Sequence, residues 1–499
     1  MSEQEQEPAP EATEIAKPES EFPIRISLSA APVALDAIAM QRLVGAFLGS
    51  AVGDALGAPF EFGPAGAYTA RFPEPVIGGT GELIGGGPFI WAPGEFTDDT
   101  QMAIALGESI VACNGFDADD VWARFQAWRR GAKDCGSLTN RALSNPSWPG
   151  AAKDAHHALR RRSAANGSLM RVTGLSCAYA AGDEATLIAA ARAQSALTHL
   201  DPAAGWGAAI GAALIRRFIL GEDALAAIPA LLELIDEPNR ERFTEMLDPS
   251  WSPHDPSDVS NGSVWGCLAQ AVWAVRTNDT FAGAVIAAID LGGDTDTVAA
   301  VAGALAGARS SVQGIPSRWL TYLNGVVGTG DDTVRYDNAA LQDLARRLAG
   351  RSPVPATITE SPAGPTEVAP GLHAADLGGA ATVPTDWAIV SMCRTHGRFD
   401  GHAIRREVHL IDQAGAANAD PAAAVRDAVD SIDAFLAEGR TVVVHCHGGR
   451  SRTGLVLKAW AIQANGWDER QAHAWLEEKW SRYEDYQISF VQLLSQNWS

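Results

Sequence analysis

The spacing of apolar residues divides the chain into two parts of different texture. From Met40 to about Gly350, long alanine-rich stretches are broken at glycine and proline, and few runs are rich in β-branched residues. Within this part, residues 41–56 place apolar side chains at positions 44, 48, 51, 52 and 55, which is the period of a helix. The pattern predicts an all-α domain over residues 36–350.

The second part alternates short apolar runs with longer amphipathic stretches, which predicts a small α/β domain over residues 368–499. Strands are predicted at 387–392, 408–411 and 441–445, and helices at 420–438 and 453–463. Residues 351–367 between the two parts are rich in proline, serine and threonine and predict a linker.

Small residues recur every fourth position in two predicted helices of the first domain. They are Gly45, Gly49, Gly53 and Gly57 in one helix, and Ala299, Gly303 and Gly307 in the other. Because glycine lowers helix stability, two such stripes predict helices whose backbones pack very close together. If these helices run antiparallel, Asp54 and Glu61 come near Asp294 and Asp296.

Composition and charge exclude several classes of function. The 499 residues carry a net charge of -22, which argues against general nucleic-acid binding and against binding to anionic membranes. Residues 1–35 predict a disordered acidic tail without the basic start and apolar core of a signal peptide. No stretch of ~20 uninterrupted apolar residues predicts a membrane span. Six cysteines without CxxC spacing indicate reduced thiols, so we expect a cytoplasmic protein.

Two acidic clusters, far apart in the chain, alternate carboxylates with hydroxyls. They are Thr97-Asp98-Asp99-Thr100 and Asp294-Thr295-Asp296-Thr297. Either cluster alone is compatible with a helix cap, since threonine and aspartate are favoured helix starters. Four carboxylates gathered in one pocket would repel each other strongly, so the pair together predicts a site for hard cations such as Mg²⁺, Mn²⁺ or Ca²⁺.

Five separated motifs of the first domain, taken in order, resemble the ADP-ribosylglycohydrolase family, which includes the dinitrogenase-reductase-activating enzymes. The motifs lie at residues 45–62, 93–102, 166–171, 195–202 and 292–297. The resemblance implies an all-helical fold with a centre of two Mg²⁺ or Mn²⁺ ions. The ligands that it implies are Thr97, Asp98, Asp99, Asp294, Asp296 and Thr297.

The same resemblance suggests residues that act on the substrate. Glu61 is the candidate catalytic carboxylate, whereas Asp54 is expected to be structural. The turn Asn166-Gly167-Ser168 and the side chain of His199 are expected to contact ADP-ribose. An ordinary tight turn and a helix-end histidine are the alternatives for these two features.

A second chemical motif stands at a predicted strand-to-helix junction, in the sequence His445-Cys446-His447-Gly448-Gly449-Arg450-Ser451-Arg452-Thr453. Five residues separate Cys446 from Arg452, and a loop of that length wraps backbone N–H groups, including those of Gly448 and Gly449, around a tetrahedral anion. The same field stabilises a thiolate at Cys446, which is the nucleophilic form. Arg452 would grip phosphoryl oxygens, and Thr453 would donate to the sulfur.

This segment resembles the dual-specificity branch of the protein tyrosine phosphatase superfamily, over roughly residues 368–499. The resemblance implies a cysteinyl-phosphate intermediate, no metal, and a general-acid aspartate upstream of the cysteine. Asp412 is the preferred candidate for that acid. Asp420, which also starts a predicted helix, is the rival.

Taken together, the sequence predicts a bifunctional hydrolase with two substrates. One is an ADP-ribosylated protein or small molecule, and the other is a phosphorylated compound. The alternative is an ADP-ribose-binding or structural scaffold on which only the phosphatase is active, because a fold alone does not prove activity.

Overall fold

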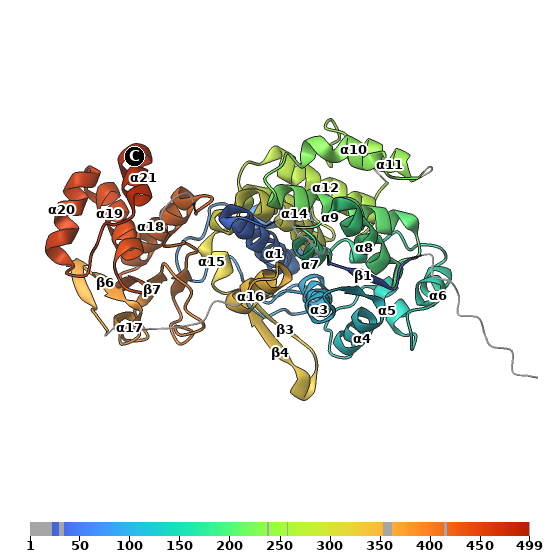
Figure 1. Cartoon of the computed structure of the whole chain (residues 1–499), viewed down its shortest axis with the longest axis horizontal. Coiled ribbons are helices and arrows are strands. Elements are labelled where there is room, and N and C mark those ends of the chain that lie inside the picture. Colours follow the sequence, from blue (N-terminus) through green and yellow to red (C-terminus); the bar gives the residue numbers. More distant parts are fainter. Residues whose placement is uncertain are drawn as a thin grey trace, which may run out of the picture.

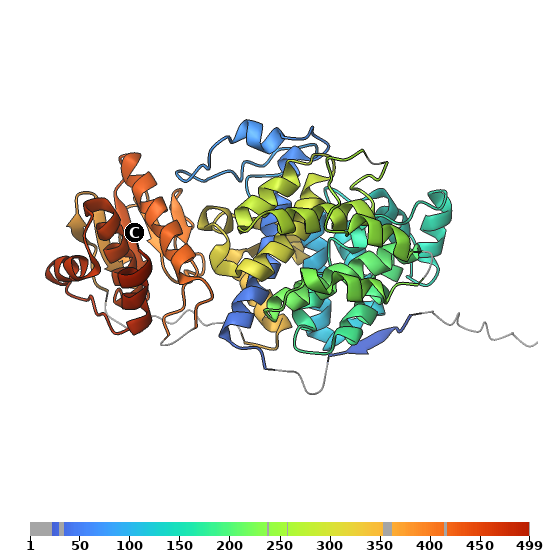
Figure 2. The same cartoon turned by 90° about the horizontal axis from the view of Figure 1, so that it is seen from above.

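A computed structural model of the chain describes residues 22–28, 34–236, 239–256, 258–352, 362–413 and 417–498. A larger helical domain lies beside a smaller C-terminal domain, coloured orange to red, along the longest axis of the molecule (Figures 1 and 2). The predicted multidomain organisation is therefore confirmed.

Helices form most of the first domain. They are α1 (Ala37–Gly57), α2 (Ala67–Arg71), α3 (Asp98–Cys113), α4 (Ala118–Arg129), α5 (Ser137–Leu143), α6 (Ala151–Ala158), α7 (Thr173–Ala178), α8 (Glu184–Ala196), α9 (Pro202–Ile219), α10 (Ile228–Leu232), α11 (Arg240–Met246), α12 (Val264–Thr277), α13 (Phe281–Ile289), α14 (Thr295–Ser310), α15 (Ser317–Leu320) and α16 (Asn338–Leu348). Two antiparallel strand pairs, which the sequence pattern did not predict, accompany them: β1 (Arg25–Ser27) with β2 (Gly115–Asp117), and β3 (Asn324–Val327) with β4 (Val334–Asp337).

The glycine stripes of α1 and α14 lie face to face, and the two helices run antiparallel. Gly45 faces Gly307, Gly49 faces Gly303, Gly53 faces Ala299, and Gly57 faces Thr295. A Cβ atom added to any of these four α1 glycines would lie less than 3.0 Å from a backbone atom of α14. The predicted close packing is confirmed, and it brings the C-terminal end of α1 to the N-terminal end of α14.

The helix α1 also passes a simple test for a membrane span. Residues Ala37–Phe60 are long and apolar enough to cross a membrane by length and composition, but 89% of the apolar window is buried inside the domain. Its apolar character on all sides is that of a central core helix.

The second domain is built on a five-stranded sheet. Its elements are β5 (Thr366–Ala369), β6 (Leu372–Asp376), α17 (Leu377–Ala380), β7 (Ala388–Ser391), β8 (Arg405–Glu407), α18 (Pro421–Ala437), β9 (Val442–Cys446), α19 (Ser451–Asn465), α20 (Glu469–Lys479) and α21 (Ile488–Asn497). The strand order is β5-β6-β9-β7-β8, with β6, β9, β7 and β8 parallel and β5 antiparallel at the edge. Val442 and Val444 of central β9 pack into the core formed with α18 and α19, and Val443 packs into the opposite one.

Three predicted boundaries differ from the structure. The predicted tail over 1–35 includes β1, which is held by an ion pair of 2.6 Å between Arg25 and Asp117. The predicted linker over 351–367 includes the start of β5, which pairs with β6. Residues 1–21, 29–33 and 353–361 of these two segments lie outside the described residues.

The predicted strand at 408–411 is also shifted. The strand in that region is β8, which ends at Glu407, and the apolar residues follow it in a loop. Val408 and Leu410 are buried in the core of the second domain, so their apolar character reflects burial of a loop and not strand pairing.

Polar side chains are buried where the two domains meet. Gln313, from the end of the first domain, donates to the carbonyl of His409 at 3.3 Å. The Arg406 guanidinium, only 1% exposed, donates to the carbonyls of Ile77 at 2.6 Å and Gly79 at 3.0 Å. Because a buried polar group is costly when its partner is lost, these bonds fix the second domain against the first.

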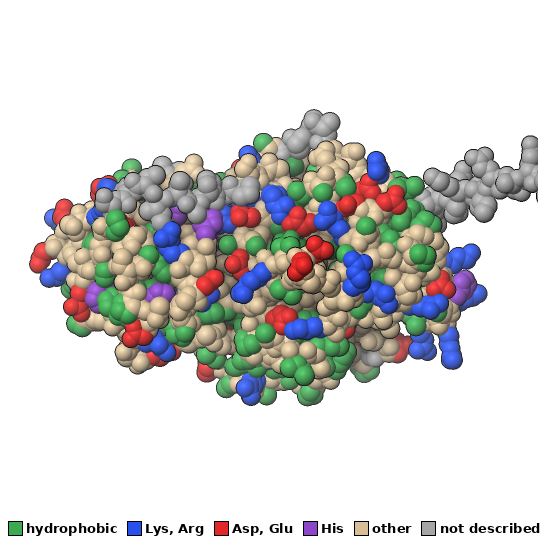
Figure 3. Space-filling view, turned by 90° about the horizontal axis from the view of Figure 1, so that it is seen from below, with side chains coloured by type: hydrophobic (Ala, Val, Ile, Leu, Met, Phe, Trp, Pro, Cys, Tyr) green, Lys and Arg blue, Asp and Glu red, His purple; other side chains and the backbone are tan. Residues whose placement is uncertain are grey.

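Charged side chains of both signs share the surface. On the face in Figure 3, acidic and basic side chains are interspersed over both domains. No continuous basic stripe, the feature that nucleic-acid binding requires, crosses the described residues on that face.

The helix seam yields a test of stability. We expect Gly53→Ala to lower the free energy of unfolding by about 1–3 kcal/mol, because the new methyl group meets the Ala299 carbonyl and the backbone cannot yield without moving the helix. Gly136→Ala is the control, since nothing lies within 4 Å of a Cβ there. Thermal unfolding of both variants checks this, and equal midpoints would contradict the close packing.

Candidate active sites

The end of the helix seam positions the first acidic cluster. Asp54, fully buried near the end of α1, accepts hydrogen bonds from the backbone N–H of Thr97 at 3.0 Å and of Thr100 at 3.1 Å. The Thr100 hydroxyl donates to the same carboxylate at 2.5 Å. Asp54 thus satisfies the orphan donors at the start of α3, in agreement with the expected structural role.

The two acidic clusters meet at this point. One carboxylate oxygen from each of Asp54, Asp99 and Asp296 lies within 4.8 Å of the others, and so does one from each of Glu61, Asp294 and Asp296. The second group shares Asp296 with the first, so the carboxylates form one continuous cluster. The sequence prediction that Glu61 comes near the second cluster is confirmed.

The predicted threonine ligands surround the same carboxylates. The hydroxyls of Thr97 and Thr297 each donate to Asp99 Oδ2 at 3.3 Å. Asp98, 6% exposed, lies beside them at the start of α3. All six predicted ligands therefore lie in one region, although whether each binds an ion stays a prediction.

Burial and mutual repulsion shape the protonation of the cluster. Burial, followed by the charges of Asp134, Asp294 and Asp54, raises the pKa of Glu61 to about 8. Burial and neighbouring carboxylates also raise the pKa of Asp99 well above its ordinary range.

The donor set of the cluster fits a divalent cation. Asp99 Oδ1 and Glu61 Oε2 are buried oxygens without a hydrogen-bond partner. Together with the other carboxylate and hydroxyl oxygens they provide the hard ligands that Mg²⁺ and Mn²⁺ prefer, and a cation would remove the repulsion.

Two residues near the cluster escaped the sequence analysis. Asp134, in the loop after α4, raises the pKa of Asp98 and of Glu61 by its charge. Asn261 accepts a hydrogen bond from the backbone N–H of Asp294 at 3.2 Å and donates to the Gly292 carbonyl at 2.8 Å. Each is a single polar residue in a loop without a repeating pattern, so no local signal marks it.

The predicted ADP-ribose turn forms the short 3-10 helix η2 (Asn166–Ser168) beside the cluster. Asn166 donates to Asp294 Oδ2 at 2.8 Å, which connects the turn to the carboxylates. The Ser168 side chain is fully buried, and its hydroxyl accepts a hydrogen bond from Ser195 at 2.8 Å. The Ser168 side chain therefore supports the turn from the core side.

His199 lies against this turn, with its ring 3.4 Å from the position of a Cβ on Gly167. Burial and the charge of Arg171 lower its pKa well below the ordinary value, so the ring is neutral. The Thr198 hydroxyl accepts from Arg171 at 2.9 Å and is hydrogen-bonded to His199 Nδ1 at 2.7 Å. The other ring nitrogen, Nε2, is a buried atom without a hydrogen-bond partner.

The second chemical motif forms the loop between β9 and α19. Cys446 is the last residue of β9 and is 1% exposed. Gly449 has a φ of +68°, and its carbonyl accepts a hydrogen bond from Trp480 Nε1 at 2.6 Å. Thr453 Oγ1, in the first turn of α19, is buried without a hydrogen-bond partner. The strand, the loop and the helix thus follow one another along the chain as the sequence predicts.

The two aspartate candidates for the general acid differ in position. Asp412 Oδ2 lies 3.4 Å from Arg452 Nε, and its carboxylate also accepts from Tyr486 at 3.1 Å. Asp420 instead caps α18, accepting from the backbone N–H of Ala423 at 2.9 Å. The geometry favours Asp412, because Arg452 belongs to the loop that holds Cys446.

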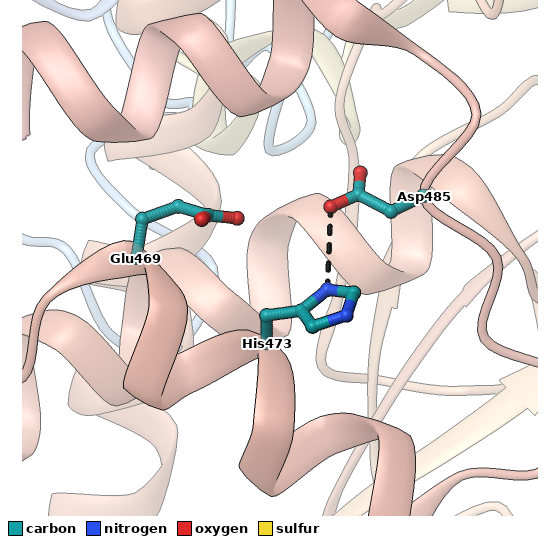
Figure 4. A group of neighbouring side chains, drawn as sticks. All are labelled: Glu469, His473 and Asp485. Carbon is teal, nitrogen blue, oxygen red and sulfur yellow. Dashed lines mark ion pairs between the residues drawn. The ribbon is translucent and has the colours of Figure 1, made fainter.

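A third acidic group, drawn in Figure 4, already holds a protein cation. Glu469, His473 and Asp485 come within metal-ligand distance of one another. However, the buried Lys458 Nζ lies 2.7 Å from Glu469 Oε1 and 2.5 Å from Asp485 Oδ2. The lysine supplies the positive charge, so this group is an ion-pair network of the second domain.

The comparisons with known proteins agree with both sites. Residues 35–356 match the family model described as ADP-ribosylglycohydrolase, and residues 408–466 match a model described as a DSP-PTPase phosphatase of polymorphic toxin systems. The first match spans more than half of the chain. The chain therefore belongs to the ADP-ribosylglycohydrolase family, and it carries a phosphatase-like domain near its C-terminus.

Individual relatives match the first domain. The ADP-ribosyl-(dinitrogen reductase) glycohydrolase of Rhodospirillum rubrum is 31% identical over 284 residues, covering 57% of this chain and 90% of that protein. The ADP-ribosylarginine hydrolase Tri1 of Pseudomonas putida (strain GB-1) is 31% identical over 324 residues, covering 63% and 80%. A solved ADP-ribosylglycohydrolase-related protein complex matches with a TM-score of 0.50 and 33% identity, covering 63% of this chain and 99% of that one.

The carboxylate cluster predicts how stability depends on pH and metal. The pKa of Glu61 rises from 4.5 to about 8 on folding, so the metal-free folded state binds more protons than the unfolded state between these values. We expect the metal-free protein to lose stability as the pH rises through this window, and millimolar Mg²⁺ to restore it. Thermal unfolding in chelator and in Mg²⁺ from pH 5 to 8 measures the effect. A Mg²⁺ shift that does not grow with pH would contradict it.

Proposed function

We propose that the chain is a bifunctional hydrolase that releases ADP-ribose at the first site and phosphate at the second. The observation that carries the first half is the single cluster formed by Glu61, Asp99, Asp294 and Asp296 at the end of the helix seam. Support for the second half comes from Cys446, Arg452 and Asp412, which meet at one end of the sheet of the second domain.

For the first site, we assign the predicted residues as follows. Two Mg²⁺ or Mn²⁺ ions, held by the residues Thr97, Asp98, Asp99, Asp294, Asp296 and Thr297, would orient the ribose hydroxyls. Glu61 transfers a proton at the ribosyl bond, which breaks through an oxocarbenium-like state. His199, through its unpartnered Nε2, and the turn at Asn166 contact ADP-ribose.

We propose an arginine-linked ADP-ribose as the first substrate to test. One matched relative carries the name ADP-ribosylarginine hydrolase. A guanidine leaving group is a strong base, so it leaves readily only when it remains protonated. A carboxyl group with a raised pKa, as at Glu61, suits that requirement.

For the second site, the Cys446 thiolate attacks phosphorus, and the phosphoryl group passes from the substrate oxygen to sulfur. Asp412 gives a proton to the leaving oxygen and then takes one from the water that hydrolyses the cysteinyl phosphate. Arg452 and the backbone N–H groups of Gly448 and Gly449 hold the phosphoryl oxygens, and Thr453 donates to the departing sulfur. No metal takes part in these steps.

The two activities separate by mutation. We expect the whole protein to release ADP-ribose from an ADP-ribosyl-arginine substrate in the presence of Mg²⁺. A chelator should abolish this release. Asp98→Asn should lower that release at least about 100-fold, because it removes a charged ligand, while Cys446→Ser leaves it unchanged. Phosphate release from p-nitrophenyl phosphate should be lost in Cys446→Ser and unchanged in Asp98→Asn. Equal ADP-ribose release from Asp98→Asn would overturn the metal assignment, and a scaffold with a silent first site would release none under any condition.

Mutation also distinguishes the two candidates for the general acid of the second site, Asp412 and Asp420. We expect Asp412→Asn to lower kcat for an alkyl phosphate by about 10²–10⁴-fold, because the leaving oxygen then lacks its proton donor. Asp420→Asn is the matched control and should leave kcat and stability nearly unchanged, because asparagine caps a helix start about as well as aspartate. A larger kcat loss in Asp420→Asn than in Asp412→Asn would reverse the assignment.

A further inference from the structure

A cavity of about 520 Å³ lies between the two domains and reaches the phosphatase residues. Asp412, His447 and Arg452 line it from the second domain, while Arg346 and Arg351 line it from the first. Arg346 lies on α16, the last helix of the first domain. One wall of the phosphatase site is therefore supplied by the ADP-ribosylglycohydrolase domain.

The walls of this cavity concentrate positive charge. Arg346 and Arg394, from different domains, line it together with Arg452. His409 also lines the cavity, and the charges of all three arginines affect the pKa of its imidazole. Burial, and then the charges of Arg394, Arg346 and Arg452, lower the pKa of His409 to about 4. The histidine is neutral because it is buried and because the guanidinium groups around the cavity disfavour a further positive charge.

Arg346 interacts with Asp343, one turn earlier on α16, only through its charge, which raises the pKa of the guanidinium, whereas burial and the charges of Arg394 and Arg351 lower it. Among the described residues it makes no hydrogen bond or ion pair, and its Nε is buried. Its neighbour Arg347, by contrast, forms a bidentate pair with Glu108, with Nη1 at 2.9 Å from Oε2. Arg347 thus stabilises the first domain, whereas nothing in the fold explains why α16 brings a guanidinium to the cavity.

Arg394 is only partly satisfied. Its Nη2 donates to the Ala339 carbonyl at 3.0 Å and to Asp343 at 2.7 Å, which ties the loop after β7 to α16. Its Nε and Nη1 are buried without hydrogen-bond partners. Buried polar groups are nearly always paired, so several N–H donors in side chains that line this cavity await an acceptor.

The acidic side chains on the wall do not meet this need. Asp36 caps α1 by accepting from the backbone N–H of Ala39 at 2.7 Å. Glu407 accepts from the Thr395 hydroxyl through Oε2 at 2.6 Å, while its Oε1 is buried without a hydrogen-bond partner and burial raises its pKa. Asp412 faces Arg452. Among the described residues, no carboxylate on the wall hydrogen-bonds to Arg346 or to Nε and Nη1 of Arg394.

We propose that the phosphatase site takes a small phosphomonoester that carries a second phosphate group. The loop from Cys446 to Arg452 holds the phosphate that is cleaved, and Arg346 with Arg394 holds the second one. This inference rests on the phosphatase function proposed above. A cavity of this volume is in the range of small-molecule sites, and guanidinium groups are the usual partners of phosphate. The arrangement also gives the fusion a role, because the first domain completes the site of the second.

Binding and turnover can be measured separately on the full chain. Isothermal titration of the Cys446→Ser protein in chelator compares glucose 1,6-bisphosphate with glucose 6-phosphate, and fructose 1,6-bisphosphate with fructose 6-phosphate. We expect the bisphosphate to bind at least tenfold more tightly in at least one pair. Adding Arg346→Gln should reduce that ratio to near one, and Arg346→Lys should restore part of it. Arg130→Gln, an exposed arginine at the end of α4, is the control and should leave the ratio unchanged.

The outcomes distinguish the two proposals. Equal affinities within both pairs, or a preference that survives Arg346→Gln, would overturn the second-phosphate site. Hydrolysis of p-nitrophenyl phosphate by the wild-type protein tests the phosphatase function on its own. A bisphosphate preference that depends on Arg346 without any hydrolysis would support the anion site and contradict the phosphatase. Faster hydrolysis of a phosphopeptide than of every bisphosphate would favour a protein substrate and overturn the inference.

Discussion

The close backbone packing of α1 on α14 is the contact on which the first site depends. Four glycines of α1 allow the helices to approach until a Cβ would overlap the opposite backbone. Because the helices are antiparallel, the end of one meets the start of the other, and Asp54, Glu61, Asp294 and Asp296 converge there. If the backbones of α1 and α14 were further apart, the two acidic groups would separate. The repulsion between the carboxylates would then fall, and the oxygen ligands for a cation would no longer be gathered. The stability given up by helical glycine therefore serves the geometry of the site.

The second site depends on a different contact, which is the docking of the two domains. Arg406 and Gln313 bury hydrogen bonds across the interface, and Arg394 bonds to Ala339 of α16. The Arg394 bond holds α16 against the loop after β7, and α16 lines one cavity together with Arg452. Two independent domains would not need these bonds, so the interface fixes the two candidate sites relative to each other. Whatever substrate enters the second site meets the wall supplied by the first domain.

Much of this architecture could be predicted from the sequence because its signals are periodic or carried by motifs. The glycine stripes predicted the close packing of the two helices, and the loop from Cys446 to Thr453 predicted the strand-to-helix junction. Features formed by tertiary contact could not be predicted in this way. β1 is a three-residue strand that pairs with a distant partner, the apolar run at Val408 belongs to a buried loop, and Asp134 and Arg346 gain significance only from what lies near them in space. The contact of the turn Asn166-Gly167-Ser168 with ADP-ribose stays a prediction, and the Ser168 hydroxyl is engaged in the core.

The most direct measurement of the central claim is anomalous diffraction from crystals of the full chain grown with Mn²⁺. The account predicts two peaks roughly 4 Å apart, in contact with the carboxylates of Asp99, Asp294 and Asp296. Absence of peaks at this cluster at saturating Mn²⁺, or ions bound only elsewhere in the molecule, would contradict the claim that the helix seam builds a two-metal centre.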